Sequence, residues 1–252
     1  MKNILYLLLF SPLLLTAQIN ESDTLNFKAD LALSGIWQRG NVQTSIFRAK
    51  SNISFKPWSS AVFKTTNSYV YQGFGKQKAD EDILSLNFLY FHPQRKVYPL
   101  VLGFVSTNFR REIDLRYLLG VGVTYQVFKK NNNWLKFSLS SEYEQTDFAR
   151  SNFNLTEYNG ESSIHTFRGT LWINGKYHLF DNKLIFGHES YYQPSLERGN
   201  NYRWRADLSL ELPVWEFLNF TINYTNTFES IVIENQQQED YFLTFGFSVK
   251  SY

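Results

Sequence analysis

The sequence predicts an all-β protein, a transmembrane antiparallel up-and-down β-barrel of about 12 strands. Three observations predict this fold. Apolar and polar residues alternate with period two along most of the chain, as in strands whose two faces meet different environments. Aromatic residues make up 18% of the chain, and barrels carry such residues on the outer wall and in interfacial girdles. After residue 17 no apolar stretch approaches the roughly 20 residues that a membrane helix needs.

The N-terminus has the features of a secretory signal peptide. Lys2 precedes an apolar run over residues 4–15, and the small residue Ala17 follows. A membrane anchor is the weaker interpretation, because the run is short and a proline interrupts it. The chain has no cysteine, so neither a lipid anchor nor a disulfide framework is expected. We expect a signal peptide over residues 1–17 and one barrel domain over residues 18–252.

Twelve segments follow the alternation, and an even number is usual in bacterial barrels. Their predicted spans, in chain order, are 25–37, 44–56, 61–72, 82–92, 98–109, 115–128, 134–146, 165–179, 184–193, 201–212, 218–228 and 240–249. Prolines fall at or near strand ends, where a missing backbone donor disturbs a sheet least, at Pro57, Pro93, Pro99, Pro194 and Pro213.

The connections between these segments alternate in length. The short ones are 57–60, 93–96, 129–133, 180–183 and 213–217, and the longer ones are 73–81, 147–164, 194–200 and 229–239. Two further connections lie on the same side as the longer ones but are short, around 39–42 and 110–114. Short turns belong to the periplasmic side of a barrel and long loops to the outside. The pattern therefore predicts an outer-membrane location with both termini in the periplasm.

Charged residues fall on the strand face opposite the aromatic one. A basic side chain facing lipid at mid-membrane costs about 2–4 kcal/mol, so we expect this face to line the lumen. The lumen-lining set is Lys28, Asp30, Arg48, Lys50, Lys64, Arg116, Lys136, Glu142, Glu144, Arg168, Lys176, Glu189, Arg203, Arg205, Asp207 and Glu211. Side chains fill or nearly fill a barrel of this size. Basic residues outnumber acidic ones, which predicts a small, weakly anion-selective conductance.

Several short segments resemble one known family. They include the segment from Ser34 through Trp37 to Asn41, the segment from Arg116 to Tyr125, and the segment from Tyr191 to Arg205. In order and spacing they are similar to the salt-induced outer-membrane protein family, a domain of unknown function, over essentially the whole mature chain. The resemblance implies a bacterial outer-membrane barrel and carries no catalytic residue across.

The last strand is similar to the C-terminal assembly signal of outer-membrane barrels. The matching residues are Thr244, Gly246, Phe247, Val249 and Tyr252. Ser251 departs from the pattern, because a hydrophobic residue is usual there. The resemblance implies recognition by the barrel-assembly machinery during insertion, followed by contact with outer-membrane lipid and lipopolysaccharide.

One tripeptide offers possible chemistry. His188 and Ser190 share one strand face, on the lipid side, and resemble the base and nucleophile of outer-membrane phospholipases. Two girdle residues are the simpler interpretation, because such a tripeptide arises easily by chance. The histidines make no metal-ligand spacing, so neither a metal nor another cofactor is predicted.

Three functions remain open from the sequence. The favoured one is not enzymatic: a narrow channel for small solutes or ions, or a structural component of the envelope. A lipid-facing hydrolase and a surface-binding barrel that acts through the loop at 148–163 are the alternatives. The net charge of +2 gives no reason to expect a nucleic-acid partner.

Overall fold

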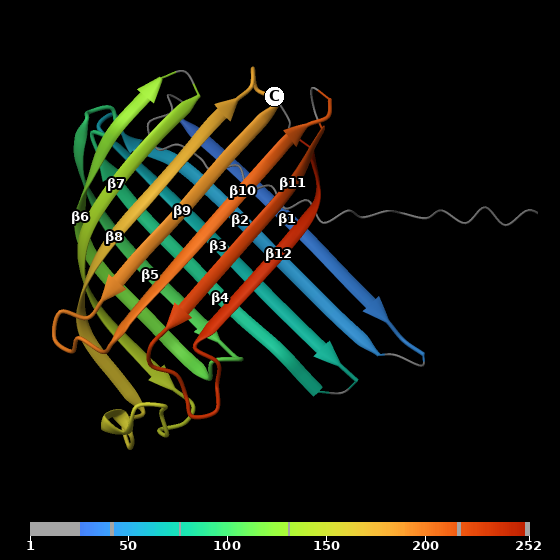
Figure 1. Ribbon diagram of the computed structural model, residues 1–252, viewed down its shortest axis with the longest axis vertical. Helices are drawn as coiled ribbons and strands as arrows, with labels where there is room; N and C mark the ends of the chain where they lie inside the picture. Colours follow the sequence, from blue (N-terminus) through green and yellow to red (C-terminus); the bar gives the residue numbers. More distant parts are fainter. Residues whose placement is uncertain (1–25, 41–42, 76, 131, 216–217, 250–252) are drawn as a thin grey trace, which may run out of the picture.

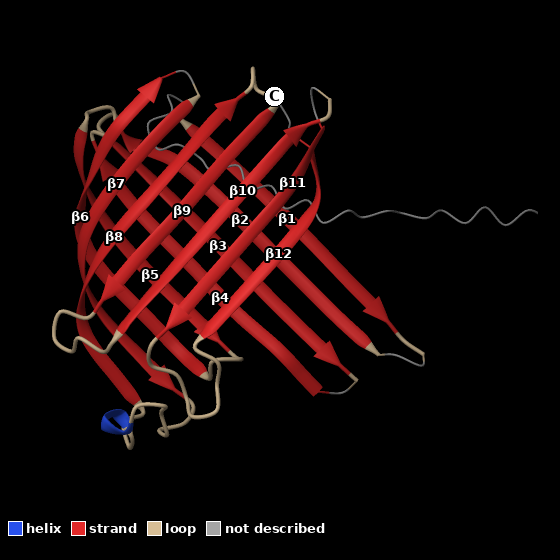
Figure 2. Cartoon of the chain, viewed as in Figure 1, coloured by secondary structure: helices blue, strands red, loops and turns tan. Residues whose placement is uncertain are grey.

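The computed structural model describes residues 26–40, 43–75, 77–130, 132–215 and 218–249. Within them the chain forms one twelve-stranded antiparallel sheet in which every strand pairs with the next one in sequence (Figure 1). Nearly all of the remainder is turns and loops (Figure 2). The described residues contain one 3-10 turn, η1 (Thr156–Tyr158), and no described helix is long and apolar enough to span a membrane.

All twelve predicted strands are present. Their bounds are β1 (Phe27–Gln38), β2 (Thr44–Trp58), β3 (Ala61–Phe74), β4 (Gln77–Phe91), β5 (Val97–Asn108), β6 (Ile113–Lys130), β7 (Asn133–Phe148), β8 (Ser163–Leu179), β9 (Leu184–Pro194), β10 (Tyr202–Pro213), β11 (Leu218–Glu229) and β12 (Glu239–Val249). The fold is thus the up-and-down all-β architecture that the alternation predicts. The signal peptide predicted over 1–17 lies outside the described residues.

The sheet curls so that its halves face each other, with β6 to β12 in front of β1 to β5 in Figure 1. Contacts across the interior prove the curl: Arg116 of β6 pairs with Glu229 of β11 at 2.7 Å, although these strands are not neighbours. In the described part of the chain, β1 and β12 are the two edges of the sheet. Complete closure in a bilayer requires these edges to pair, because lipid cannot satisfy their backbone groups.

The register fixes which side chains point inward. Side chains with the parity of Arg116 face the interior, and those with the parity of Leu119 face outward. Outward-facing apolar side chains are exposed, for example Leu119 at 66% and Leu139 at 60%. An exposed apolar outer wall around a polar interior is the arrangement expected of a barrel whose outer solvent is lipid.

One part of the interior is apolar. Tyr90 of β4, Tyr98, Leu100 and Leu102 of β5 and Leu118 of β6 form a buried cluster. This cluster reaches the opposite wall through Phe88, whose ring centroid lies 6.2 Å from that of Trp172 on β8. We call these residues the inner apolar cluster.

Two predicted boundaries are wrong. The predicted loop 73–81 is a tight turn, because β3 continues to Phe74 and β4 already begins at Gln77, with a register shift at Gly73. The polar stretch from Gln77 to Glu81 continues the ladder instead of leaving it. The predicted loop 229–239 likewise begins one residue early, because Glu229 is the last residue of β11.

Candidate functional site: a charged interior closed by loops

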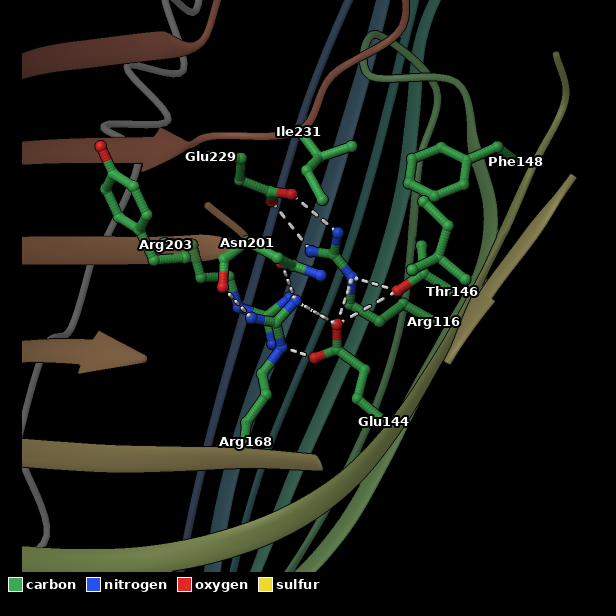
Figure 3. Close-up of a pocket in the computed structure, with 11 residues that line it drawn as sticks. Arg116, Glu144, Thr146, Phe148, Arg168, Asn201, Arg203, Glu229 and Ile231 are labelled. Carbon is green, nitrogen blue, oxygen red and sulfur yellow. Dashed lines mark hydrogen bonds and ion pairs between the residues drawn. The ribbon is translucent and has the colours of Figure 1, made fainter. Parts of the chain in front are cut away.

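The interior holds a buried ion-pair network at the end where the long loops lie. Glu144 of β7 is its centre, with its side chain 3% exposed. It pairs with Arg203 of β10 and, at 3.0 Å, with Arg168 of β8 (Figure 3). Arg116 of β6 lies 3.9 Å from Glu144 and holds Glu229 of β11 by two bonds of 2.9 and 2.7 Å. We call these five residues the outer charge cluster.

Alternation along the strands explains why these residues meet. Arg203 is registered directly against Glu229, so the first inward residue of β10 lies beside the last of β11. Glu144 and Arg168 lie on paired strands with Glu142 opposite Arg168. Five strands therefore each contribute a long charged side chain at the same level of the barrel. Three guanidinium groups and two carboxylates fill this level.

The outer charge cluster leaves almost no open space. The cavity that it lines has a volume of about 20 Å³ and is also bounded by Phe148, Ile164 and Ile231. Such a volume accommodates about one water molecule. The interior between β6 and β11 is therefore closed at this level.

A second buried layer lies next to the outer charge cluster, on the side away from the long loops. Glu142 accepts hydrogen bonds from Ser140 and, at 2.9 Å, from Thr170. Gln193 of β9 donates to Thr170 at 2.5 Å and accepts from Arg203 at 2.5 Å, which joins this layer to the outer charge cluster. Buried polar networks stabilise a single arrangement only when their members are satisfied, as most are here.

Arg111 extends the network to the last hairpin. It lies in the turn between β5 and β6, and its side chain is 8% exposed. Its guanidinium donates to Asp240 of β12 at 2.7 Å and lies 3.6 Å from Glu229. The turn after β5 is thereby fastened to both strands of the β11–β12 hairpin.

Two long loops cover the outer charge cluster. Phe153 and Tyr158 of the β7–β8 loop and Ile231 and Ile233 of the β11–β12 loop are buried together against Phe148, Ile113 and Ile164. Phe153 and Ile233 form a β-bridge, and the two loops lie together at the lower end in Figure 1. We call this structure the loop cap.

A third loop is attached beside the cap. Glu197, between β9 and β10, accepts hydrogen bonds from the Thr166 hydroxyl at 2.7 Å and from the Phe167 amide at 3.1 Å. These two bonds lower the pKa of the Glu197 carboxyl, and the bond from Thr166 has the larger effect. Arg198 stacks over Tyr158 of the cap with 4.9 Å between the guanidinium and the ring centroid.

The charges elsewhere in the interior are packed less tightly. Arg205 and Asp207 pair along β10 at 2.5 Å, and their side chains remain 39% and 34% exposed. Lys50 of β2 interacts electrostatically with both of them and with Glu189 of β9. Arg48 is exposed. We call Arg48, Lys50, Lys64, Glu189, Arg205 and Asp207 the mid-lumen charges.

At the opposite end one further pair crosses between strands. Lys176 of β8 lies 3.2 Å from Glu211 of β10. Nearby, the fully buried Lys136 places its ammonium 4.9 Å from the ring centroid of Trp134. Each predicted lumen-lining charge of the ten described strands from β2 to β11 therefore has the inward parity.

His188 and Ser190 lie on the outer face of β9. Nε2 of His188 is 3.2 Å from the Tyr177 hydroxyl, and the two rings stack with centroids 5.7 Å apart. Ser190 is registered against Ala206 and Ile173. The hydrolase hypothesis stays a prediction; the hydrogen bond that the imidazole makes is with a tyrosine of the outer wall.

The residues of the assembly signal are placed in part. Thr244 and Gly246 lie in β12, registered against Asn223 and Thr221. Phe247 and Val249 extend the same strand, and Tyr252 lies outside the described residues.

Sequence reasoning missed two residues of the network. The sequence prediction places Glu229 in a loop, although Glu229 continues the inward positions of Thr225 and Thr227, so one more step of the alternation includes it. Arg111 gave no comparable signal, because a turn residue has no strand parity. Its partners are more than one hundred residues away in sequence.

Comparison with known proteins supports the fold. No curated protein matches the chain. One solved structure, described as that of the NanC porin, superposes with a TM-score of 0.51 at 11% sequence identity, covering 88% of this chain and 100% of that one. The likeness shows a porin-type barrel fold. A family model matches residues 31–250, and the chain belongs to the family described as "Protein of unknown function, DUF481".

Proposed function

We propose that this protein is a narrow outer-membrane channel for small anions, with an outer mouth held closed by the outer charge cluster and the loop cap. In this proposal the chain is exported by its signal peptide and inserted by the barrel-assembly machinery. Both termini face the periplasm, the long loops face outward near lipopolysaccharide, and the protein has no catalytic role. The porin-type fold and the family membership support the channel class.

One observation carries the proposal: the loosely packed part of the interior has a basic excess. Arg48, Lys50, Lys64 and Arg205 face only Glu189 and Asp207 among the mid-lumen charges. Incompletely paired charges in a bore select ions of the opposite sign. A filled interior at the outer charge cluster keeps any conductance small.

The test is planar-bilayer recording of conductance and reversal potential on the purified full chain. We expect a small, weakly anion-selective current in the wild type. Lys50→Glu plus Arg205→Glu reverses the sign of two lumen charges, which makes the lumen more negative by four charge units, and should shift the reversal potential towards cation selectivity. Arg150→Glu is the control, because Arg150 lies on a loop with its side chain 54% exposed.

The size of the current tests the closed mouth. Glu144→Gln removes the carboxylate charge that holds Arg168 and Arg203 together, so mutual repulsion of the guanidinium groups should open the level and raise the conductance. A large, unselective wild-type pore would contradict the proposal. The filled interior also favours a second candidate, a structural envelope component, and a complete absence of current in wild type and Glu144→Gln would support that one.

A further inference from the structure

Five polar side chains form a patch on the outer face of β2, β3 and β4. They are Ser51, Thr65, Asn67, Ser85 and Asn87, and we call them the outer polar patch. The register pairs Ser51 with Asn67 and Asn67 with Ser85, so the patch crosses three neighbouring strands in one row.

The orientation of the patch is fixed by residues of opposite parity. On β4, Phe88 touches Trp172 of β8 across the interior, so the adjacent Asn87 points outward. On β3, Lys64 belongs to the inward face, so Thr65 points outward. The patch therefore lies on the wall that faces lipid elsewhere in the molecule.

The patch also lies at mid-height. Ser51 is the eighth of the 15 residues of β2, Asn67 is the seventh of the 14 of β3, and Ser85 is the ninth of the 15 of β4. The corresponding mid-strand outward residues of other walls are apolar, for example Val121, Leu171 and Leu208. Strand midpoints of a barrel lie near the centre of the hydrocarbon, where water is absent.

Hydrogen bonds within the patch satisfy it only in part. Asn87 donates to Ser85 at 3.0 Å, and Ser85 donates to Asn67 Oδ1 at 2.7 Å. Asn67 donates to Thr65 at 3.1 Å and to Ser51 at 3.4 Å. These four bonds do not use the hydroxyl proton of Ser51 or the carbonyl and second amide proton of Asn87. Such groups are costly in hydrocarbon unless another protein surface pairs with them.

We propose that the outer polar patch is the contact surface of a homodimer in the membrane. Lipid tails offer no hydrogen bonds, so the occupant must be protein with donors and acceptors at the same depth. A second copy meets that condition, because asparagine and serine side chains each donate and accept. A two-fold axis beside Ser85 lays the patch of one copy against the same patch of the other, and two-fold symmetry is the commonest symmetry of oligomers.

The experiment uses the full chain in lipid nanodiscs and in native outer membranes. The wild type should show dimer mass by mass photometry. Ser85→Cys should form a disulfide-linked dimer on oxidation, since the chain has no other cysteine. Ser141→Cys on the outer face of β7 should remain monomeric under the same conditions.

A substitution pair then tests the polar contact itself. Asn67→Leu plus Asn87→Leu should raise the dimer dissociation constant about tenfold or more, while heat-modifiability on gels shows that the barrel still folds. Asn226→Leu, an outward asparagine of β11, should leave dimerisation unchanged. A monomeric wild type across all protein-to-lipid ratios would overturn the proposal. So would a Ser85→Cys adduct with a different protein, or a dimer unaffected by the double substitution.

Discussion

The wall from β6 to β11 and the wall from β2 to β4 differ in the chemistry of their outer faces. The first has charged and hydroxyl side chains inside, many under 6% exposed, and apolar side chains outside. The second has the outer polar patch outside. Inside, β4 contributes Leu84, Leu86 and Phe88, whereas β2 and β3 contribute the charged Arg48, Lys50 and Lys64. Both keep strict alternation, so the same backbone pattern serves two arrangements.

The difference shows that alternation alone does not determine whether the polar face of a strand is the inner or the outer one. On β10 the polar face is the inner one; on the middle of β4 it is the outer one. Contacts between strands that are distant in sequence decide the matter, such as Arg203 with Glu144 and Phe88 with Trp172. The β6–β11 wall encloses a polar core, whereas the β2–β4 wall carries the proposed dimer contact.

The largest effect should come from breaking the polar core of the first wall. Glu144→Leu removes the shared partner of Arg168 and Arg203 and leaves buried guanidinium groups unpaired, so we expect a loss of about 3–5 kcal/mol in the free energy of unfolding. Asp207→Leu breaks a half-exposed pair and should cost about 1 kcal/mol or less. Urea unfolding in lipid vesicles measures both, and equal losses would remove the distinction between the buried and the loose charges.

The lipid-facing side of the same wall is tested by a basic residue. Leu208→Arg places a charge at mid-strand on the outer face of β10 and should cost about 2–4 kcal/mol. The neighbouring Ser209→Arg points into the interior and should insert normally. Membrane fractionation with heat-modifiability is the readout, and equal tolerance of the two would show that the face assignment is wrong.

Close packing between β6 and β7 predicts a smaller effect. A Cβ added at Gly122 would lie 2.6 Å from the Leu139 carbonyl oxygen, so Gly122→Ala forces the strands apart and should cost about 1–3 kcal/mol. A Cβ at Gly103 would lie 3.9 Å from its nearest contact, a Leu119 side-chain carbon, so Gly103→Ala is the control. Unfolding by urea that does not separate the two variants would argue against tight packing in this wall.

The smallest effect concerns pH at the outer rim. Arg150 donates hydrogen bonds to Glu112 and lowers the pKa of its carboxyl. A carboxyl with a lowered folded-state pKa stabilises the fold above its unfolded pKa, and that contribution disappears as pH falls through the folded value. Glu112→Gln should therefore flatten the loss of thermal stability below about pH 4.5. An unchanged acid slope would mean that the pair is unimportant in solution.

Strand positions were predictable because alternation is a local property. All twelve strands overlap their predicted spans, and the inward parity of Arg168, Arg203 and Asp207 follows from counting by two. The predicted loop 73–81 is wrong because a polar stretch does not by itself indicate a loop. There the strands β3 and β4 extend outward beyond the expected apolar zone, where both faces can be polar.

The partners across the interior could not be predicted. Which arginine meets Glu144 depends on the stagger and curl of the whole sheet, which no local pattern records. The loop cap was also hidden, because Phe153 and Ile233 lie in segments without periodicity and come together from distant loops. The outer polar patch is a further feature of this kind. On β4 the polar residues Ser85 and Asn87 lie on the outer face, whereas Lys64 of the neighbouring β3 lies on the inner face.

Because the two loops of the loop cap are joined, we expect them to open together when a current flows. Asn154 accepts from the Val232 amide at 3.0 Å, donates its own amide to the Val232 carbonyl at 3.0 Å, and donates its side chain to Ser230 at 2.9 Å. Neither loop can swing away without breaking these bonds and the bridge at Phe153 together. The pair should move as a single lid with two positions. Single-channel records would then show discrete jumps between a closed and an open level, with dwell times shortened by Asn154→Ala.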